Sequence, residues 1–432
     1  MLSERNLTPR WAPDLNSGYG VPLFIFHYPF PNYIGAIFHF FGASFVDSFK
    51  LALASGYMLA ALACFLWLKK IFSPFAATVG GIVFAVVPYW FVEIYVRGSV
   101  GEVWAIAWFF IALAAIEYKN VFLISFAAAF LILSHNIMAM LLIPTMIFYL
   151  CIRNRKEWWT VLVGILLSAY FWLPALAERG LVNGLNSVNY KDHFPLLAQL
   201  LIPSWGTGFS VREFTSDEMS FQIGVAPLFI FLLACGMGKI RKPLRSLALL
   251  FSLVGLAALF LMLEMSQPVW KTISVFPLIQ YPWRFLVFAL PITAFFTGWV
   301  VTRIPRWVAV GLGIFAVALS LPYMRPVVYA PRTDNYYLTR PEFTDGTSSI
   351  GNTFSTIWTE WKKSRSKEKI QVLAGTASIS QERMAPLRYE FAVDAREESS
   401  IDVHTLYYPG WEVVVDGVTT PIEYQKEGII TF

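Results

Sequence analysis

The sequence predicts an α-helical polytopic membrane protein with a small β domain near its C-terminal end. The 432 residues are 57% hydrophobic and only 14% charged, whereas soluble domains carry about 25% charged residues. Apolar runs long enough to cross a bilayer, about 17–25 residues, recur through the first three quarters of the chain. After Tyr323 the composition becomes polar and then alternates in the manner of β-strands.

The apolar runs predict about ten transmembrane helices. Pro144 and Pro174 lie inside two of these runs, and in a helix bundle such prolines produce kinks rather than ends. The expected helices cover residues 48–68, 72–92, 101–117, 120–135, 137–152, 158–177, 221–238, 245–263, 284–302 and 306–323.

Basic residues follow every second predicted helix, from the first to the ninth, and the alternate loops hold few of them. These basic clusters are Lys69-Lys70, Lys119, Arg153 to Lys156, Lys239 to Arg245, and Arg303 with Arg306. Because Lys and Arg favour the cytoplasmic side, we expect the clusters inside and the other loops, 178–220 and 264–283 included, outside. The expected organisation in the cell membrane is an extracytoplasmic first-loop segment with an interfacial helix (1–47), a transmembrane bundle (48–323) and an extracytoplasmic β-rich domain (324–432).

The two ends of the chain raise separate expectations. The first residues lack the apolar core of a signal peptide, so either the N-terminus inserts unaided or a first transmembrane helix lies upstream of Met1. Short β-type runs occupy 370–373, 388–393, 401–407, 411–415 and 428–432. Asp416-Gly417 is a two-residue hairpin signal. The last run stops at Phe432 in the middle of a strand pattern, which predicts a β domain that continues beyond it.

Residues 9–31 are rich in Pro, Gly and aromatic residues and hold a single acid, Asp14. The segment is too broken by Pro and Gly to be a transmembrane helix. This composition is typical of a shaped surface, on which Asp14 acts as a catalytic base or orients an acceptor. The alternative is that Asp14 caps a turn after Pro13, a frequent role for Asp.

Glu93, Arg97 and Glu102 lie at the outer end of the predicted second and third helices. If the helix continues to Arg97, then Glu93 and Arg97 are four residues apart and face each other. Ionisable groups at membrane depth usually face an interior or a cavity. We expect Arg97 to clamp a phosphate through its planar fork while Glu102 acts on a hydroxyl. The alternative is an interfacial salt bridge.

Two further polar residues stand at expected outer helix ends. His135 separates two apolar runs, where it either bonds a phosphate or carboxylate or provides the polar residue that a tight helical turn requires. Arg284 follows Pro282 and Trp283 and is unusual outside under the positive-inside rule. It holds a lipid phosphate or extends to the headgroups.

Several function classes lack their sequence signals. The chain has no Walker loop or Gly-rich dinucleotide turn and no His/Cys spacing for zinc, although a divalent metal ion is left open. The net charge of +5 is explained by topology, and no basic-aromatic module indicates nucleic acid. Because the inner loops are too short for a nucleotide-binding domain, an activated substrate should come from the lipid or the outer side. Sugars linked to polyprenyl phosphate have this property.

Five segments carry a resemblance to a known family. They are the Pro-rich stretch 9–31, RGSVGE at 97–102, LSHN at 133–136, YPWRF at 281–285 and YPGWEVVVDG at 408–417. In order and spacing they resemble a bacterial and archaeal membrane family labelled 6-pyruvoyl-tetrahydropterin synthase-related, whose label implies no pterin chemistry here. That family is similar to the GT-C superfamily of membrane glycosyltransferases, which have a helical bundle, a large first outer loop with an acidic residue, and interfacial helices.

The resemblance implies a glycosyltransferase that moves a hexosyl or pentosyl group from a polyprenyl-phosphate carrier to an extracytoplasmic glycan, lipid or protein acceptor. It implies catalytic roles for Asp14 and Glu102 and substrate binding by Arg97, His135 and Arg284. The first helix of that superfamily, and the acidic residue that follows it, would lie before Met1. The alternatives are a lipid or glycan transporter or assembly protein, whose essential polar residues should lie on both sides of the bilayer, and an inactive relative.

Overall fold

The structure is a computed structural model that describes residues 7–184, 188–214, 217–238, 240, 242–339, 354–359, 365–424 and 427–432. The chain divides into two compact units. The β unit comprises Met1–His27, Tyr170–Val188 and Arg332–Phe432, and the helical unit comprises Tyr28–Ala169 and Asn189–Pro331. Lys239 and Arg241, of the fourth basic cluster, lie outside the described residues.

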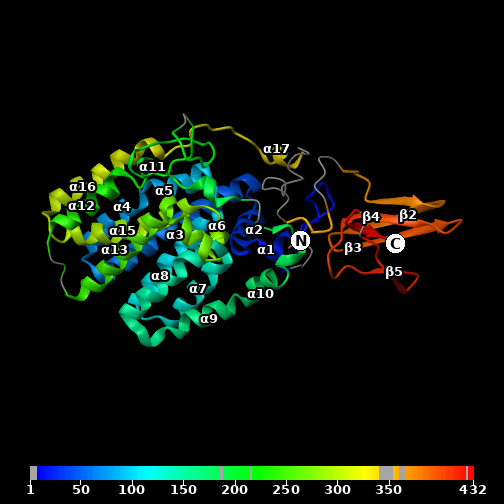
Figure 1. Ribbon diagram of the computed structural model, residues 1–432, viewed down its shortest axis with the longest axis horizontal. Helices are drawn as coiled ribbons and strands as arrows, with labels where there is room; N and C mark the ends of the chain where they lie inside the picture. Colours follow the sequence, from blue (N-terminus) through cyan, green and yellow to red (C-terminus); the bar gives the residue numbers. More distant parts are fainter. Residues whose placement is uncertain are drawn as a thin grey trace. The chain divides into compact units, whose positions relative to one another are not determined.

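The helical unit consists of long apolar helices joined by short helical turns (Figure 1). The longer helices are α2 Phe30–Phe40, α3 Phe45–Ile71, α4 Pro74–Ala85, α6 Val100–Glu117, α7 Val121–Ser134, α8 Asn136–Asn154, α9 Trp159–Leu167, α12 Val225–Gly236, α13 Lys242–Met262, α15 Ala289–Val301 and α16 Arg306–Ser320. The shorter ones are α5 Pro88–Phe91, η2 Val92–Val96, η3 Arg155–Glu157, η6 Tyr190–His193, α11 Leu197–Leu201, η7 Glu264–Ser266, α14 Gln267–Thr272, η8 Phe276–Ile279, η9 Pro282–Phe288 and η10 Leu321–Tyr323.

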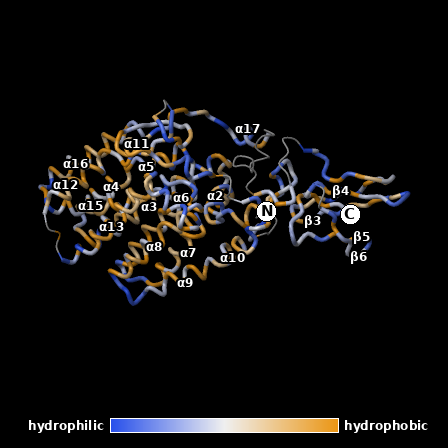
Figure 2. Tube along the Cα trace, viewed as in Figure 1, coloured by the Kyte–Doolittle hydropathy of each residue, from blue (hydrophilic) through white to orange (hydrophobic). Residues whose placement is uncertain are grey.

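Six helices of the described chain are long and apolar enough to cross a membrane, and eight spans result if each of two bent helix pairs counts as one. The bent pairs are α4 with Pro88–Val96, and α9 with α10 (Ala169–Ala177). Figure 2 shows hydrophobic residues along these helices. The chain is therefore a mostly helical, multi-pass membrane protein. Each of the ten predicted runs contains a helix, but ten spans are not confirmed because α7 and α12 are only 14 and 12 residues long.

Polar caps explain where several of these helices begin. Ser44 accepts the N–H of Asp47 at 3.0 Å before α3, and Asn120 accepts that of Leu123 at 3.0 Å before α7. A side-chain cap satisfies a backbone donor that the first turn leaves unpaired. The second predicted helix breaks at Pro88, and Ser320 of α16 donates to the carbonyl oxygen of Val86 at 2.7 Å beside the break.

Within its described residues, the β unit holds seven strands in three small antiparallel sheets. Its central sheet has the order β1-β4-β7, with Ile370 opposite Val403 and Val403 opposite Ile430. The elements of the unit are α1 Leu23–Phe26, α10, η4 Arg179–Leu181, α17 Asp334–Leu338, β1 Ile370–Ala374, β2 Ala377–Ala385, β3 Arg388–Ala395, β4 Ser400–Leu406, β5 Val413–Val415, β6 Val418–Thr420 and β7 Ile429–Thr431. The Asp416-Gly417 hairpin is confirmed, since both residues have positive φ, 49° and 83°, between β5 and β6.

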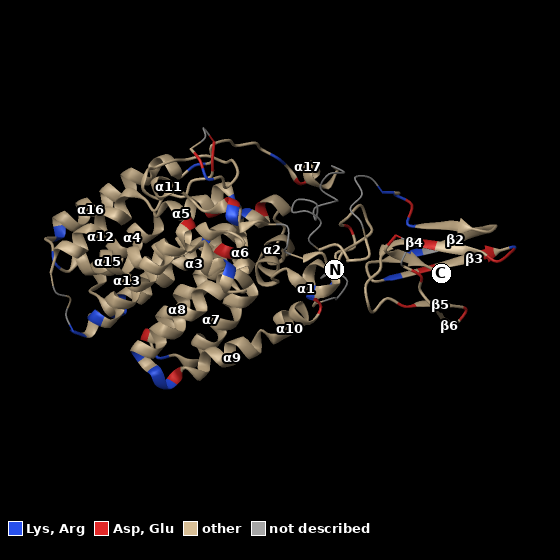
Figure 3. Ribbon diagram, viewed as in Figure 1, with Lys and Arg blue, Asp and Glu red and all other residues tan. Residues whose placement is uncertain are grey.

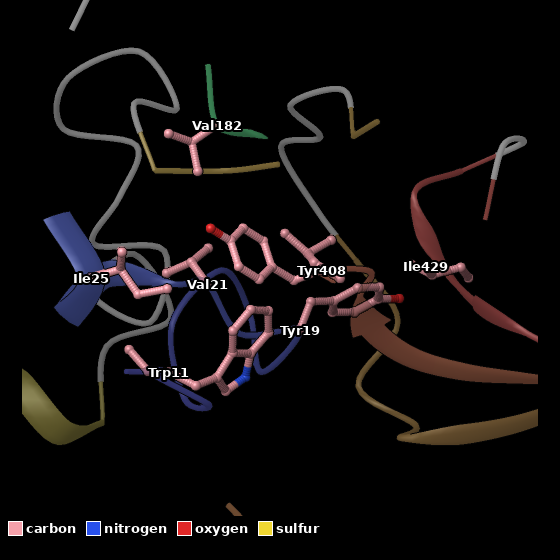
Figure 4. Close-up of a cluster of buried hydrophobic side chains, with 9 residues drawn as sticks. Trp11, Tyr19, Val21, Ile25, Val182, Tyr408 and Ile429 are labelled. Atoms are coloured by element: carbon pink, nitrogen blue, oxygen red, sulfur yellow. The ribbon is translucent and has the colours of Figure 1, made fainter. Parts of the chain in front are cut away.

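The N-terminal segment supplies much of the core of the β unit. Trp11, Tyr19 and Val21 are buried against Leu406 of β4 and against Tyr408 (Figure 4). The backbone N–H of Leu406 donates to the carbonyl oxygen of Tyr19 at 2.9 Å. The described part of residues 1–27 thus packs with strands from the far end of the chain, a grouping that differs from the sequence ranges 1–47 and 324–432.

Candidate functional site

The buried charges of the helical unit gather where helices end or break. Glu93 lies in η2 with Arg97 directly after it, and Glu102 lies in the first turn of α6. His135 separates α7 from α8, and Arg284 lies in η9. Glu93 and Glu102 are fully buried, His135 is 4% exposed and Arg284 5%. These five residues form what we call the charge cluster, which holds four of the five predicted site residues.

Glu102 accepts hydrogen bonds at the centre of the charge cluster. Arg97 Nη2 donates to Glu102 Oε1 at 2.7 Å, and Arg284 Nε donates to the same oxygen at 3.2 Å. His135 Nε2 lies 3.6 Å from this oxygen, and the Tyr89 hydroxyl donates to Oε2 at 3.3 Å. A buried carboxylate requires such partners. Nitrogen groups from three separate segments therefore converge on one oxygen atom.

Arg97 is held on three sides. Its Nη1 donates to both carboxylate oxygens of Glu93 at 2.6 Å, so the predicted pairing of these two residues is confirmed, although η2 is a π-helix rather than an α-helix. The guanidinium carbon also lies 4.6 Å from the ring centroid of Trp283, a cation–π geometry. The other terminal nitrogen, Nη2, is the one that reaches Glu102.

Arg284 is anchored to a strained turn. Gln280 has φ 67° and ψ −47°, and Tyr281 N–H donates to the oxygen of Ile279 at 2.8 Å. This combination is a positive-φ γ-turn, a rare and strained conformation. Arg284 Nη1 donates to Ile279 O at 2.7 Å and to Gln280 Oε1 at 2.9 Å. The same side chain thus bonds the turn through Nη1 and Glu102 through Nε.

His135 has two roles at once. Its Nδ1 accepts the N–H of Met138 at 3.2 Å and so caps α8. In a neutral imidazole the other nitrogen then carries the hydrogen, so the Nε2–H group is available to Glu102. The ring centroids of Tyr28 and His135 are 4.7 Å apart. Burial, together with the Glu102 carboxylate, raises the pKa of Tyr28 to about 12, so its hydroxyl remains protonated at neutral pH.

The formal charges of the cluster cancel. Glu93 and Glu102 contribute two negative charges and Arg97 and Arg284 two positive charges, while His135 is neutral in the tautomer just described. Such a network satisfies its own charges, as a purely structural salt bridge would. Its chemical capacity lies in the two guanidiniums and the imidazole N–H, which together can hold the oxygens of an anion.

Asp14 belongs to the β unit and not to the helical unit. Its side chain is exposed in the turn that follows Pro13. Burial lowers the pKa of Lys369 to about 8, and the Asp14 carboxylate opposes that shift. Lys369 Nζ donates to the carbonyl oxygens of Gly18 and His404 at 2.7 and 2.9 Å. The position of Asp14 is that of a turn residue, and its catalytic role remains a prediction.

A second polar group lies at the other end of α6, where Arg153 is exposed, and we call it the opposite-end group. Glu117, the last residue of α6, accepts from Arg153 Nε at 2.6 Å and from the Tyr149 hydroxyl. Trp67 Nε1 donates to the Tyr149 hydroxyl at 2.8 Å. At ~1.5 Å per residue, Glu102 and Glu117 are about 22 Å apart along the helix. Figure 3 shows further basic residues in the adjoining turn between α8 and α9.

The uncharged members of the site carry little or no signal in the sequence. Tyr89 lies in an aromatic run in which no residue stands out, and Tyr28 is one ring among many in the N-terminal stretch. Gln280 carries a weak signal, because an amide four residues before an Arg in a loop can reach its guanidinium. The positive φ of Gln280 has no sequence signal, since Gly or Asn would be the expected residue there.

Within the described residues, no group of three or more His, Cys, Asp or Glu side chains is arranged to hold a metal ion. In comparisons with known proteins, no family model, no curated protein and no solved structure matches the chain.

Proposed function

We propose that the protein is a membrane glycosyltransferase of GT-C-like architecture, which moves a sugar from a polyprenyl-phosphate carrier to an extracytoplasmic acceptor. The observation that carries this proposal is the convergence of Arg97, Arg284 and His135 on the single oxygen Oε1 of Glu102. Donors of this kind, fixed in place and away from water, stabilise the charge that develops on a departing phosphate. The apolar bundle around them accommodates the lipid chain of the carrier.

The residues have distinct roles in this reaction. Arg97 and Arg284 stabilise the leaving lipid phosphate, and the His135 N–H assists them. Before the substrate binds, Glu102 orients both guanidiniums, and in the reaction it acts on a substrate hydroxyl. Asp14, or an acidic residue upstream of Met1, accepts the proton of the acceptor hydroxyl as the new sugar bond forms, which is general-base catalysis. The acceptor is a glycan, a lipid or a protein.

The proposal includes ten membrane crossings in the cell membrane, with residues 1–47 and 324–432 on the outer side. The crossings comprise the six long helices, the two bent pairs, and the shorter apolar helices α7 and α12. The distribution of charge supports this sidedness. Lys69-Lys70 lie in the last turn of α3, and Lys119 follows the last residue of α6. The charge cluster lies at the opposite end of α6, so it is separated from Lys119 by the length of that helix.

The proposal is tested with full-length protein in lipid nanodiscs and a panel of radiolabelled polyprenyl-phosphate sugars. We expect Arg284→Gln to lower sugar release by about 100–1,000-fold, the usual cost of one lost stabilising donor. Arg303→Gln, a matched change at the opposite end of η9–α15, should leave release unchanged. Equal rates for the two variants would contradict the proposal, and unchanged transfer by Asp14→Asn would remove Asp14 from its role.

A second candidate, a lipid or glycan transporter, is favoured by one observation. A carrier that alternates between two sides should have polar residues near both, and the opposite-end group places Glu117 and Arg153 at the far end of α6 from the charge cluster. Proteoliposomes containing a lipid-linked sugar distinguish the two functions. A transporter moves the molecule across the bilayer with its sugar–phosphate bond intact, whereas a transferase breaks that bond.

A further inference from the structure

The carboxylate of Glu102 is surrounded by nitrogen groups of the kind that bind anions. Its Oε1 faces Arg97 Nη2 at 2.7 Å, Arg284 Nε at 3.2 Å and His135 Nε2 at 3.6 Å. Proteins also bind a phosphate oxygen by directing several N–H groups at it. Beside Arg97, the indole N–H of Trp283 has no hydrogen-bond partner among the described residues, although the residue is only 2% exposed.

We propose that the Glu102 carboxylate occupies the binding position of a ligand's phosphodiester group. The ligand displaces the Glu102 carboxylate from this position, and one proton is taken up. The inference rests on the proposed function, in which the ligand is a phosphate-bearing lipid. No bond between heavy atoms changes in this step, and the one new bond is the O–H bond of the protonated carboxyl. The phosphodiester oxygen takes the donors of Arg97, Arg284 and His135, and the released carboxylate is neutralised by a proton from water.

The charge balance requires the proton. Without a ligand, the two carboxylates and two guanidiniums of the cluster cancel. A phosphodiester adds one negative charge to a place where Glu93 and Glu102 are fully buried. An uncompensated charge there is expensive, and a buried group that can neutralise does so instead. One proton restores the balance without moving either guanidinium.

Contacts around the cluster identify the group that takes the proton. His135 cannot take it without losing the α8 cap, because its Nδ1 accepts the Met138 N–H. Glu93 keeps both oxygens on Arg97 Nη1 at 2.6 Å. The phenols of Tyr28 and Tyr89, which also face the cluster, are already protonated and cannot accept a further proton. Glu102, which gives up its donors to the ligand, is the remaining site.

The test measures binding of a methyl polyprenyl phosphodiester, whose single charge is constant from pH 5.5 to 8.5, to the full chain in detergent. We expect the wild-type affinity to fall by up to about tenfold per pH unit as the pH rises, because binding of one proton is linked to binding of the ligand. Glu102→Gln, which imitates the neutral carboxyl, should bind independently of pH and more tightly than wild type at pH 8.5. Glu264→Gln, the same change at an exposed carboxylate, should keep the wild-type profile.

Three outcomes would overturn the inference: wild-type binding that does not depend on pH, a Glu102→Gln variant that keeps the slope, or one that binds more weakly at pH 8.5. The first of these leaves the proposed function standing, whereas an absence of binding at every pH removes both. If Glu102→Gln does not fold, calorimetry of wild type in two buffers of different protonation enthalpy gives the proton count directly. One proton per ligand supports the displacement, and none refutes it.

Discussion

Gly101 sets the spacing within the charge cluster, and its replacement by Ala is a sharp test of that packing. A Cβ at Gly101 would lie 2.3 and 2.5 Å from ring carbons of Tyr28 and 2.7 Å from the backbone oxygen of Ser134. The ring can shift, but the oxygen belongs to the last turn of α7 and cannot rotate away. Gly101→Ala should therefore push α6 from the junction that carries His135.

The expected cost is about 1–3 kcal/mol, the usual cost of overpacking a closed interior. Each kcal/mol lowers Tm by about 2–4 °C in a domain of 150–250 residues, so Tm should fall by roughly 2–12 °C. Gly311→Ala in α16 is the matched control, because a Cβ there meets nothing within 4 Å. It should be neutral or stabilising by up to about 1 kcal/mol, through helix propensity alone.

The chain supplies its own reporter for this measurement. Cys64 is fully buried in α3, whereas Cys151 and Cys235 are exposed. In a background with Cys151→Ser and Cys235→Ser, a thiol-reactive fluorogenic dye in detergent reports only the unfolding that uncovers Cys64. If Gly101→Ala unfolds at the temperature of Gly311→Ala, then α6 is not packed against Tyr28 and Ser134 as described, and the reasoning fails.

Three further predictions concern both units. Because burial lowers the pKa of Lys369 to about 8, from 10.5 for the free side chain, the unfolded chain binds this proton more tightly. The β unit should therefore gain stability from pH 8 to 10.5, and Lys369→Met should reduce that gain in proteolysis at stepped pH. Tyr408→Phe removes a 2.6 Å hydrogen bond to the Glu178 carboxylate, so the β unit should lose about 1.5–3 kcal/mol and be cleaved sooner; cleavage at the wild-type rate would contradict this. Tyr149→Phe leaves the Trp67 N–H without its acceptor, so the free energy of unfolding of the helical unit should fall by about 1–3 kcal/mol. The Cys64 labelling assay measures this change, and an unchanged Tm would contradict the prediction.

The helices and the charged part of the site could be predicted because their signals are local. Arg97, Glu102 and Arg284 are ionisable residues in an apolar context, where a charge is costly and needs a partner. The pairing of Glu93 with Arg97 followed from their spacing. Their meeting with Arg284, across more than 180 residues of chain, depends on tertiary packing, to which single-sequence patterns give no access.

Other features lacked a local signal. β2 was not predicted because its residues, ASISQERMA, are mostly polar, so neither apolar content nor alternation marks the strand. Asp14 is the lone acid of an aromatic segment, and the residues beside it give no signal for its solvent-exposed place in a turn. The packing of that segment against β4 is likewise a long-range contact, made by residues that alone resemble an irregular surface loop.

The packing of Tyr19 against Leu406 affects how the β unit can fold during synthesis. Tyr19 and Leu406 belong to one hydrophobic core, so Tyr19 must wait until Leu406 has been synthesised. At roughly 5–20 residues per second, this interval is about 20–80 s. During that time Trp11 and Tyr19 lack the native partners that β4 and the residues after it supply, so their apolar rings are open to non-native contacts.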